Sequence, residues 1–263
     1  RAADGAALGT GTTVEFEQTG GVFSLLPNDT LGQVMQAALD ASRIDGIENN
    51  LRWLRDVVRH EGFASGEVST RLLDGVAYAR RAVRVIAGGT ATSVQDWPGR
   101  LGLWDVGVPP SGPMDDRSFR LGNLVLGNPE GTAGLEVTAS GPTLLFEAPA
   151  TICLTGADFG AWLDGVPAPR GVPVAIAAGQ TLALGRASGG GMRGYILFAG
   201  GLDVVPYLGS AATFTLGQFG GHAARALVAG DVLHLGDALT GEPDPASLPE
   251  FGRTWSLRVL YGP

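Results

Sequence analysis

The chain has 263 residues, of which 44% are hydrophobic and 17% charged, and 42 are glycine. This composition is typical of a turn-rich, largely β protein that is long enough to bury a substantial core. The formal net charge is −8 and all 18 basic residues are arginine. The acidic balance argues against nucleic acid as a partner, and the lack of lysine excludes a phosphate-loop, Schiff-base or biotin-carrying lysine within this sequence.

Cysteine and histidine restrict the chemistry further. Cys153 is the single cysteine, which excludes an internal disulfide framework and a multi-cysteine metal site, and the three histidines are far apart in sequence. We therefore expect no metal. No apolar run reaches the roughly 18 residues of a membrane helix, and no leader opens the sequence, so we expect a cytoplasmic protein without a membrane partner.

Residues 1–80 are predicted to begin with two short strands around Gly20 and Gly21 and then to become helical. Apolar residues recur at intervals of three and four over 28–43 and again over 47–60, and 65–75 form a shorter helical piece. Asp29 or Thr30 is the expected N-cap of the first helix.

From residue 81 the pattern changes to short apolar runs separated by turn residues. One helix is predicted from Met114 to Leu126, opened by Ser111 or Pro113. Many short strands with turn signals indicate a closed or nearly closed β-barrel. The predicted strands are 83–87, 143–147, 150–155, 173–177, 181–184, 194–199 and 226–235.

Residues 94–116, VQDWPGRLGLWDVGVPPSGPMDD, combine glycine and proline with charge just before the predicted helix. Such a rigid loop suits a site that turns backbone N–H groups toward an anion, and Arg100 offers a bidentate partner for it. The alternative is structural: Asp96 and Arg100 pair with each other and the loop only holds its shape. Glu136 is likewise either a buried partner of an arginine or a site residue.

Three stretches carry a family resemblance: SVQDWPGRLGLWDVGVPPSGPMDDRSFRLGNLVLGN, GLEVTASGPTLLF and GGLDVVPYLGSAATFTLGQFGGHAARALVAGDVL. They resemble the carboxyltransferase domain of urea carboxylases, a domain type that also occurs as allophanate hydrolase subunit 2, as the C-type component of 5-oxoprolinase and as the Kip-type kinase-inhibitor partner. Residues 38–73 are similar to the end of a biotin carboxylase domain. The resemblance implies a mainly β fold, a cyclophilin-like β-barrel after a small α/β remnant.

The implied domains are a truncated C-terminal part of biotin carboxylase (1–80), the carboxyltransferase domain (81–240), and a linker with the start of its next part (241–263). The implied enzyme is a biotin-dependent ligase of urea degradation that transfers the carboxyl group of N-carboxybiotin to urea and gives allophanate. Biotin would sit on a separate carrier domain, and ATP would be used only by the missing biotin carboxylase core. An allophanate hydrolase subunit 1-like domain is a further implied partner.

Seven residues on the matching motifs are candidate site residues. The expected catalytic residues are Asp96, Arg100 and Asp115, and the expected substrate-binding residues are Gln95, Ser111, Asn123 and Glu136. Arg100 and the helix N-terminus near Ser111 would steady the carboxyl or ureido group, and Asp96 or Asp115 would accept hydrogen bonds from urea.

Two other functions stay open at this point: a C-type component of a 5-oxoprolinase, and a Kip-type regulatory module without catalysis. The missing carboxylase core and carrier suggest that the chain is a fragment and inactive alone.

Overall fold

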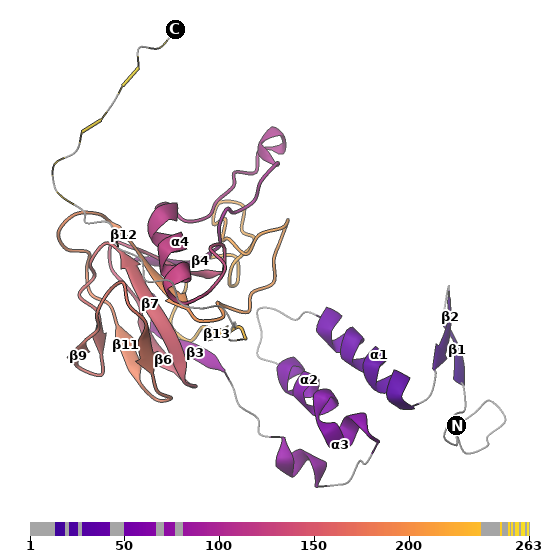
Figure 1. The fold of residues 1–263 in the computed structure, drawn as a ribbon. Coiled ribbons are helices and arrows are strands. Elements are labelled where there is room, and N and C mark those ends of the chain that lie inside the picture. Colours follow the sequence, from indigo (N-terminus) through magenta and orange to yellow (C-terminus); the bar gives the residue numbers. More distant parts are fainter. Residues whose placement is uncertain are drawn as a thin grey trace. The chain divides into compact units, whose positions relative to one another are not determined.

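The computed structural model describes residues 14–18, 21–25, 28–42, 50–66, 71–76 and 81–237, and isolated positions after them (248, 252, 254, 256–257, 259–260 and 262). The chain divides into two compact units, Arg1–Ala79 and Arg80–Pro263, which we treat separately. Figure 1 shows the helices of the first unit and the sheets of the second.

The first unit begins with an antiparallel hairpin, β1 (Val14–Gln18) and β2 (Gly21–Leu25), which confirms the two predicted strands. Three helices follow: α1 (Asn28–Ala41), α2 (Leu51–Arg59) and α3 (Glu61–Ala64). Arg59 joins α2 to α1 through two hydrogen bonds of 2.8 and 3.0 Å to the Asp40 carboxylate. Of the helical piece predicted over 65–75, the described part forms a 3₁₀ turn, η1 (Leu72–Gly75). The relation of this unit to biotin carboxylase stays a prediction.

The second unit contains two antiparallel sheets. The five-stranded sheet has the order β10-β7-β12-β5-β4, and the six-stranded sheet has the order β13-β3-β6-β11-β8-β9. The strands in chain order are β3 (Ala82–Ala87), β4 (Ala91–Gln95), β5 (Gly134–Thr138), β6 (Thr143–Phe146), β7 (Ala150–Gly156), β8 (Trp162–Leu163), β9 (Val166–Pro167), β10 (Val174–Ile176), β11 (Thr181–Ala183), β12 (Arg193–Phe198) and β13 (Val232–His234).

Alternation along the central strands gives the five-stranded sheet two buried faces. In β12, Ile196 and Phe198 enter the main core, whereas Tyr195 and Leu197 pack on the opposite face. Leu135 and Val137 of β5 belong to the main core as well, so Glu136 between them points to the second face. The helix α4 (Asp116–Val125) packs against β7 and β12, as Figure 1 shows.

A close contact holds α4 on the sheet. A Cβ added to Gly122 would come within 2.7 Å of Thr155 Cγ2, and the Thr155 hydroxyl donates to the Ser118 carbonyl at 2.9 Å. Glycine in mid-helix costs about 1 kcal/mol relative to alanine, but here it permits the close approach. The helix begins at Asp116 with Asp115 as its N-cap, so neither Ser111 nor Pro113 opens it.

The predicted closed barrel is not confirmed, because the described strands form two open antiparallel sheets. Several edge strands have only two or three residues, and the outer edge of β4 is covered by loops: Thr213 N–H and Leu227 N–H donate to the carbonyls of Val94 and Thr92. The strand predicted over 226–235 is shortened to β13, because Val228 and Asp231 close a turn ahead of it.

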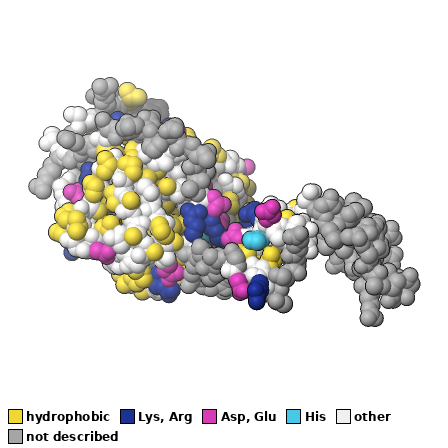
Figure 2. Space-filling view, turned by 60° about the horizontal axis from the view of Figure 1, so that its bottom comes forward, with side chains coloured by type: hydrophobic (Ala, Val, Ile, Leu, Met, Phe, Trp, Pro, Cys, Tyr) yellow, Lys and Arg dark blue, Asp and Glu magenta, His cyan; other side chains and the backbone are white. Residues whose placement is uncertain are grey.

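The predicted strands that correspond to β3, β6, β7, β10, β11 and β12 are confirmed within one residue or two. Figure 2 shows a face of the larger unit on which many apolar side chains are visible among polar ones. No helix in the described ranges is long and apolar enough to span a bilayer.

Candidate functional site

Three strands and the N-terminus of α4 meet in a buried polar cluster. Glu136 Oε2 accepts hydrogen bonds from the Met114 backbone N–H at 2.7 Å and from the Tyr195 hydroxyl at 3.1 Å. The same hydroxyl accepts from the Asp115 N–H at 2.7 Å, and Arg193 Nε lies 3.3 Å from Glu136 Oε1. The carboxylate therefore receives N–H and O–H donors that α4 and β12 supply, and Glu136 is paired with an arginine.

Burial, and secondarily the Glu136 charge, raises the pKa of Tyr195 well above its ordinary value. The phenol therefore stays protonated over the range in which the protein is folded, and it can donate to Glu136 while accepting from Asp115. Sequence reasoning missed Tyr195, because a tyrosine inside the apolar run RGYILF resembles ordinary core.

Gln95 and Ser111 shape the loop that precedes α4. Gln95 Oε1 accepts from the Gly112 N–H at 3.1 Å, and its amide nitrogen donates to Ser93 Oγ at 3.0 Å. Ser111 has a φ of 58°, a left-handed conformation that is uncommon for a residue with a side chain and that often occurs at functional positions. No hydrogen bond of its hydroxyl occurs within the described residues.

Asp115 is occupied by the helix that it caps. Its carboxylate accepts from the Ser118 N–H at 3.0 Å and from the Ser118 hydroxyl at 2.5 Å. Since the N–H groups of Met114, Asp115 and Ser118 all have protein acceptors, they are not available to the anion that the sequence led us to expect at this helix end.

Asp96 and Arg100 both turn inward, to a segment more than 100 residues later. Asp96 accepts from the Ser210 hydroxyl at 2.5 Å and from the Ala211 N–H at 2.8 Å. The Arg100 guanidinium donates to backbone carbonyls of the same segment, and the residue is only 1% exposed. Burial lowers the pKa of this guanidinium, an effect that the Asp96 charge opposes.

Asn123 is fully buried and holds the chain that follows α4. Its amide nitrogen donates to the carbonyls of Glu130 and Thr132 at 3.2 and 2.9 Å, and its oxygen accepts from Asn128 at 2.9 Å. Of the seven predicted residues, Ser111 alone has a side chain without a hydrogen bond in the described part of the chain.

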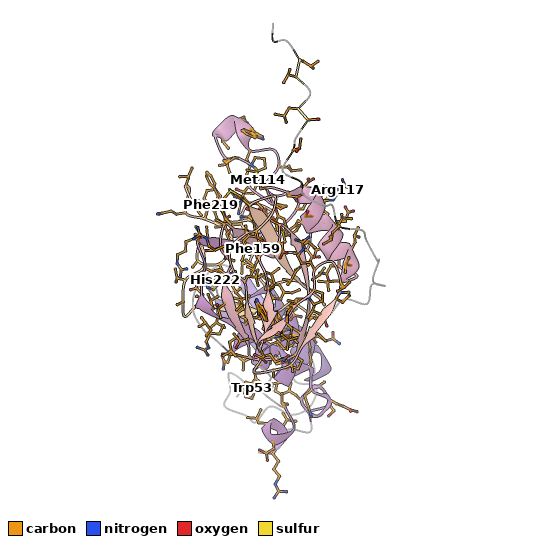
Figure 3. The ribbon with its side chains drawn as sticks, turned by 90° about the vertical axis from the view of Figure 1, so that its left-hand side faces the viewer. Trp53, Met114, Arg117, Phe159, Phe219 and His222 are labelled. Carbon is orange, nitrogen blue, oxygen red and sulfur yellow. The ribbon has the colours of Figure 1, made fainter. Side chains whose placement is uncertain are left out.

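Side chains that remain available surround this frame. Arg117, in the first turn of α4, is exposed, and no ion pair or hydrogen bond of its guanidinium occurs among the described residues. Leu101, Trp104 and Met114 are 66%, 71% and 74% exposed. In Figure 3, Met114, Arg117 and Phe219 lie toward the same end of the larger unit.

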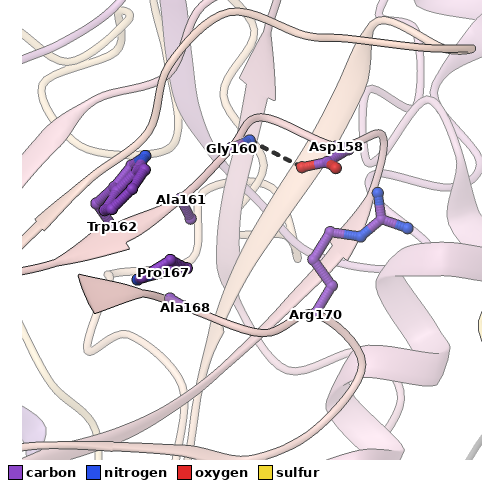
Figure 4. A pocket seen from close by; sticks show the side chains of 7 residues that line it. All are labelled: Asp158, Gly160, Ala161, Trp162, Pro167, Ala168 and Arg170. Carbon is purple, nitrogen blue, oxygen red and sulfur yellow. Dashed lines mark hydrogen bonds between the residues drawn. The ribbon is translucent and has the colours of Figure 1, made fainter. Parts of the chain in front are cut away.

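A pocket of about 370 Å³ lies elsewhere, and Figure 4 shows Asp158 and Arg170 on its wall. Gly156 of β7 pairs with Gly194, which pairs with Val137, whereas Gln95 pairs with Gly134. Asp158 therefore leaves the sheet at the end opposite to Gln95. The remaining lining residues are Gly160, Ala161, Trp162, Pro167 and Ala168.

The charges of this pocket are not paired with each other. Asp158 Oδ1 accepts from the Gly160 N–H at 2.8 Å, and no ion pair of Asp158 or Arg170 occurs in the described ranges. The described residues also contain no group of three or more His, Cys, Asp or Glu side chains that could hold a metal ion.

Comparison with known proteins places this geometry in context. Residues 106–263 match the family described as carboxyltransferase domain, subdomain A and B. Urea amidolyase of Saccharomyces cerevisiae is 38% identical over 246 residues, which cover 90% of this chain and 13% of that protein. The chain thus spans a small part of this curated relative.

Two further relatives bear on the fold and on the alternatives. The crystal structure of the Kluyveromyces lactis urea carboxylase superposes with a TM-score of 0.74 at 36% identity, covering 88% of this chain and 21% of that one. The C-type component of the Escherichia coli 5-oxoprolinase is 34% identical over 181 residues, which are 69% of this chain and 58% of that protein.

Proposed function

The chain belongs to the carboxyltransferase domain family, subdomain A and B, and from this membership we propose that it is part of a biotin-dependent urea carboxylase. The proposed reaction transfers the carboxyl group of N-carboxybiotin to urea and gives allophanate. The observation that supports it most is the similarity to urea amidolyase over 90% of this chain.

Biotin would visit this chain as a substrate from a carrier domain, because the sequence has no lysine to which it could be attached. The exposed side chains of Leu101, Trp104 and Met114 beside the Ser111 hydroxyl fit a ring with an apolar and a ureido side. When bound, the carboxylated ring supplies an activated carboxyl group: its N–C bond breaks, a new N–C bond forms to urea, and a urea proton passes to the ring nitrogen.

The proposed ligand contacts differ from most of those expected from the motifs. Ser111 and Arg117 keep unengaged polar groups, and an arginine fork is well suited to a carboxylate. Gln95, Asn123 and Glu136 serve the reaction by holding the loop and the helix that carry Ser111 and Arg117. The isolated chain is proposed to be inactive, because the ATP-dependent and carrier functions lie outside it.

The reverse reaction tests this proposal without ATP. Allophanate and biocytin are mixed with the protein, and biocytin-dependent CO₂ release is measured for the isolated chain and for the complete enzyme with its partner domains. We expect release only from the complete enzyme, with a KM for allophanate raised about tenfold or more in Arg117→Ala, as for loss of a charge-assisted pair. Arg170→Ala is the matched control.

Two results would contradict the proposal. Unchanged kinetics in both Ser111→Ala and Arg117→Ala would remove the site assignment. The absence of any urea- or allophanate-dependent reaction in the complete enzyme would remove the substrate.

The similarity to the C-type component of 5-oxoprolinase favours one second candidate, a part of an ATP-dependent 5-oxoprolinase. Turnover of 5-oxoproline and none of urea by the complete enzyme would select it. The shorter match, 69% of this chain against 90%, places it behind urea carboxylation.

A further inference from the structure

We propose that Asp96 and Arg100 are positioning residues that fix the segment 207–221 beside the loop 94–116, so that these two segments form two walls of one ligand site. The ligand part of this inference rests on the proposed function. The positioning part rests on contacts alone, and it can be tested without any ligand.

Arg100 satisfies three carbonyl groups of the segment at once. Its Nε donates to the Tyr207 carbonyl at 3.0 Å, and its Nη2 donates to the carbonyls of Ser210 (3.3 Å) and Ala212. The guanidinium also lies over the Phe219 ring, 4.9 Å from the centroid. A planar group with donors in a fixed fork can hold a curved backbone in this way, whereas the single ammonium of lysine cannot.

Asp96 supplies the acceptors that Arg100 lacks. Its two oxygens accept from the Ser210 hydroxyl and the Ala211 N–H, and Ser210 Oγ accepts in turn from the Ala212 N–H at 2.9 Å. The two side chains thus bind both carbonyls and N–H groups over a few consecutive residues. The loop 94–116 is tied to the same frame, since the Arg100 N–H donates to the Pro110 carbonyl at 2.7 Å.

Gly220 closes the arrangement from the other side. Its φ is 72°, and a Cβ at this position would overlap Arg100 Nη2 and the Ala212 carbonyl oxygen. Leu208 and Gln218 adopt φ values of 53° and 55° although they carry side chains. Such conformations persist where the surroundings impose them, and they cluster at ligand-binding loops.

The two sides of the segment differ in chemistry. The polar backbone groups face the buried pair, whereas the side chains of Tyr207, Leu208 and Leu216 are 51%, 49% and 90% exposed. Arg100 at 1% exposure cannot itself touch a ligand, so any effect on the reaction must pass through this segment. Arg100 Nη1 is buried without a hydrogen bond partner in the described part of the chain, a cost that is rarely retained without a role.

The experiment compares Gly220→Ala with Gly230→Ala. Both glycines have positive φ, 72° and 95°, but no atom lies within 4 Å of a Cβ at Gly230, so this control carries the backbone strain without the overlap. Hydrogen exchange of peptides that cover 207–221 is measured in each full chain, together with the melting temperature. The kcat and KM of biocytin-dependent CO₂ release are measured in the complete enzyme, and Arg100→Lys serves as a second variant.

We expect exchange in 207–221 to rise at least tenfold in Gly220→Ala and Arg100→Lys and to stay at the wild-type value in Gly230→Ala. We also expect kcat to fall at least tenfold in the first two variants, with melting temperatures close to that of Gly230→Ala. Unchanged exchange overturns the positioning role. Raised exchange with an unchanged kcat overturns the link to the ligand site. A wild-type enzyme that does not act on allophanate refutes the proposed function, while the exchange data still decide whether the pair fixes the segment.

Discussion

The two ends of the five-stranded sheet use charge in opposite ways. At the end where β4 leads into the loop 94–116, Asp96 and Arg100 turn inward to backbone groups. At the other end, Asp158 and Arg170 line an open pocket without an ion pair in the described residues. A charged residue in a glycine- and proline-rich motif can therefore be part of the frame, and burial, rather than the motif, decides between the two roles.

The strongest test of this contrast replaces one arginine at each end. Arg100→Ala should lower the free energy of unfolding by about 3–5 kcal/mol, because it leaves Asp96 and several carbonyls buried without their donor. Arg170→Ala should change it by less than about 0.5 kcal/mol. Urea unfolding followed by tryptophan fluorescence measures both values, and equal losses would contradict the contrast.

Tyr195→Phe sharpens the comparison within the buried end. Removal of the hydroxyl leaves the Asp115 N–H without its acceptor and Glu136 without one donor, so a loss of about 1–3 kcal/mol is expected. Tyr207→Phe is the matched control, since Tyr207 is 51% exposed. Calorimetry of the two variants would refute the assignment if the control lost as much stability as Tyr195→Phe.

Asp231 lies between the two extremes. Burial acts to raise its pKa, but hydrogen bonds from Arg225 and the Val228 N–H outweigh this effect and hold the pKa below its ordinary value. The resulting stability is present above the pKa of the unfolded chain, near 4, and is lost as the pH falls through the lower folded value. Asp231→Asn should therefore cost about 1 kcal/mol at pH 7 and less near pH 3, as measured by thermal unfolding at both pH values. A difference that grew toward pH 3 would contradict this sign.

Cys153 gives the smallest effect, a rate without a change in stability. Burial raises the pKa of its thiol to about 12, so the reactive thiolate is about one part in 10⁴ at pH 8. A thiol reagent such as dithionitrobenzoate should react only after denaturation. Rapid reaction in the native chain would show that the face beneath α4 is open to solvent.

Periodicity predicted those elements whose residues are mostly apolar. The strands β6, β7 and β12 read directly as apolar runs, whereas β4 (ATSVQ) and β5 (GLEVT) were missed. Their alternate side chains, Ser93, Gln95 and Glu136, face the loop and the helix on the second face of the sheet. Polar residues in a doubly buried strand hide the pattern on which the prediction depends.

The site residues could be picked from the motifs, but their roles could not be derived. Arg100 finds its partners at Tyr207 and Ser210, more than 100 residues away, and local spacing carries no information on such contacts. Arg117 was passed over because one more arginine on a helix surface has no distinguishing sequence signal. Its importance depends on which neighbouring charges are already paired.

For protein engineering, the segment 207–221 offers a division between what must be kept and what can be varied. Its backbone is determined by Asp96, Arg100 and Gly220, whereas Tyr207, Leu208 and Leu216 make their contacts outward. A library restricted to these three outward positions would change the shape and polarity of one wall while each member keeps the same backbone. Acceptance of new amides could then be selected without a loss of stability in each step.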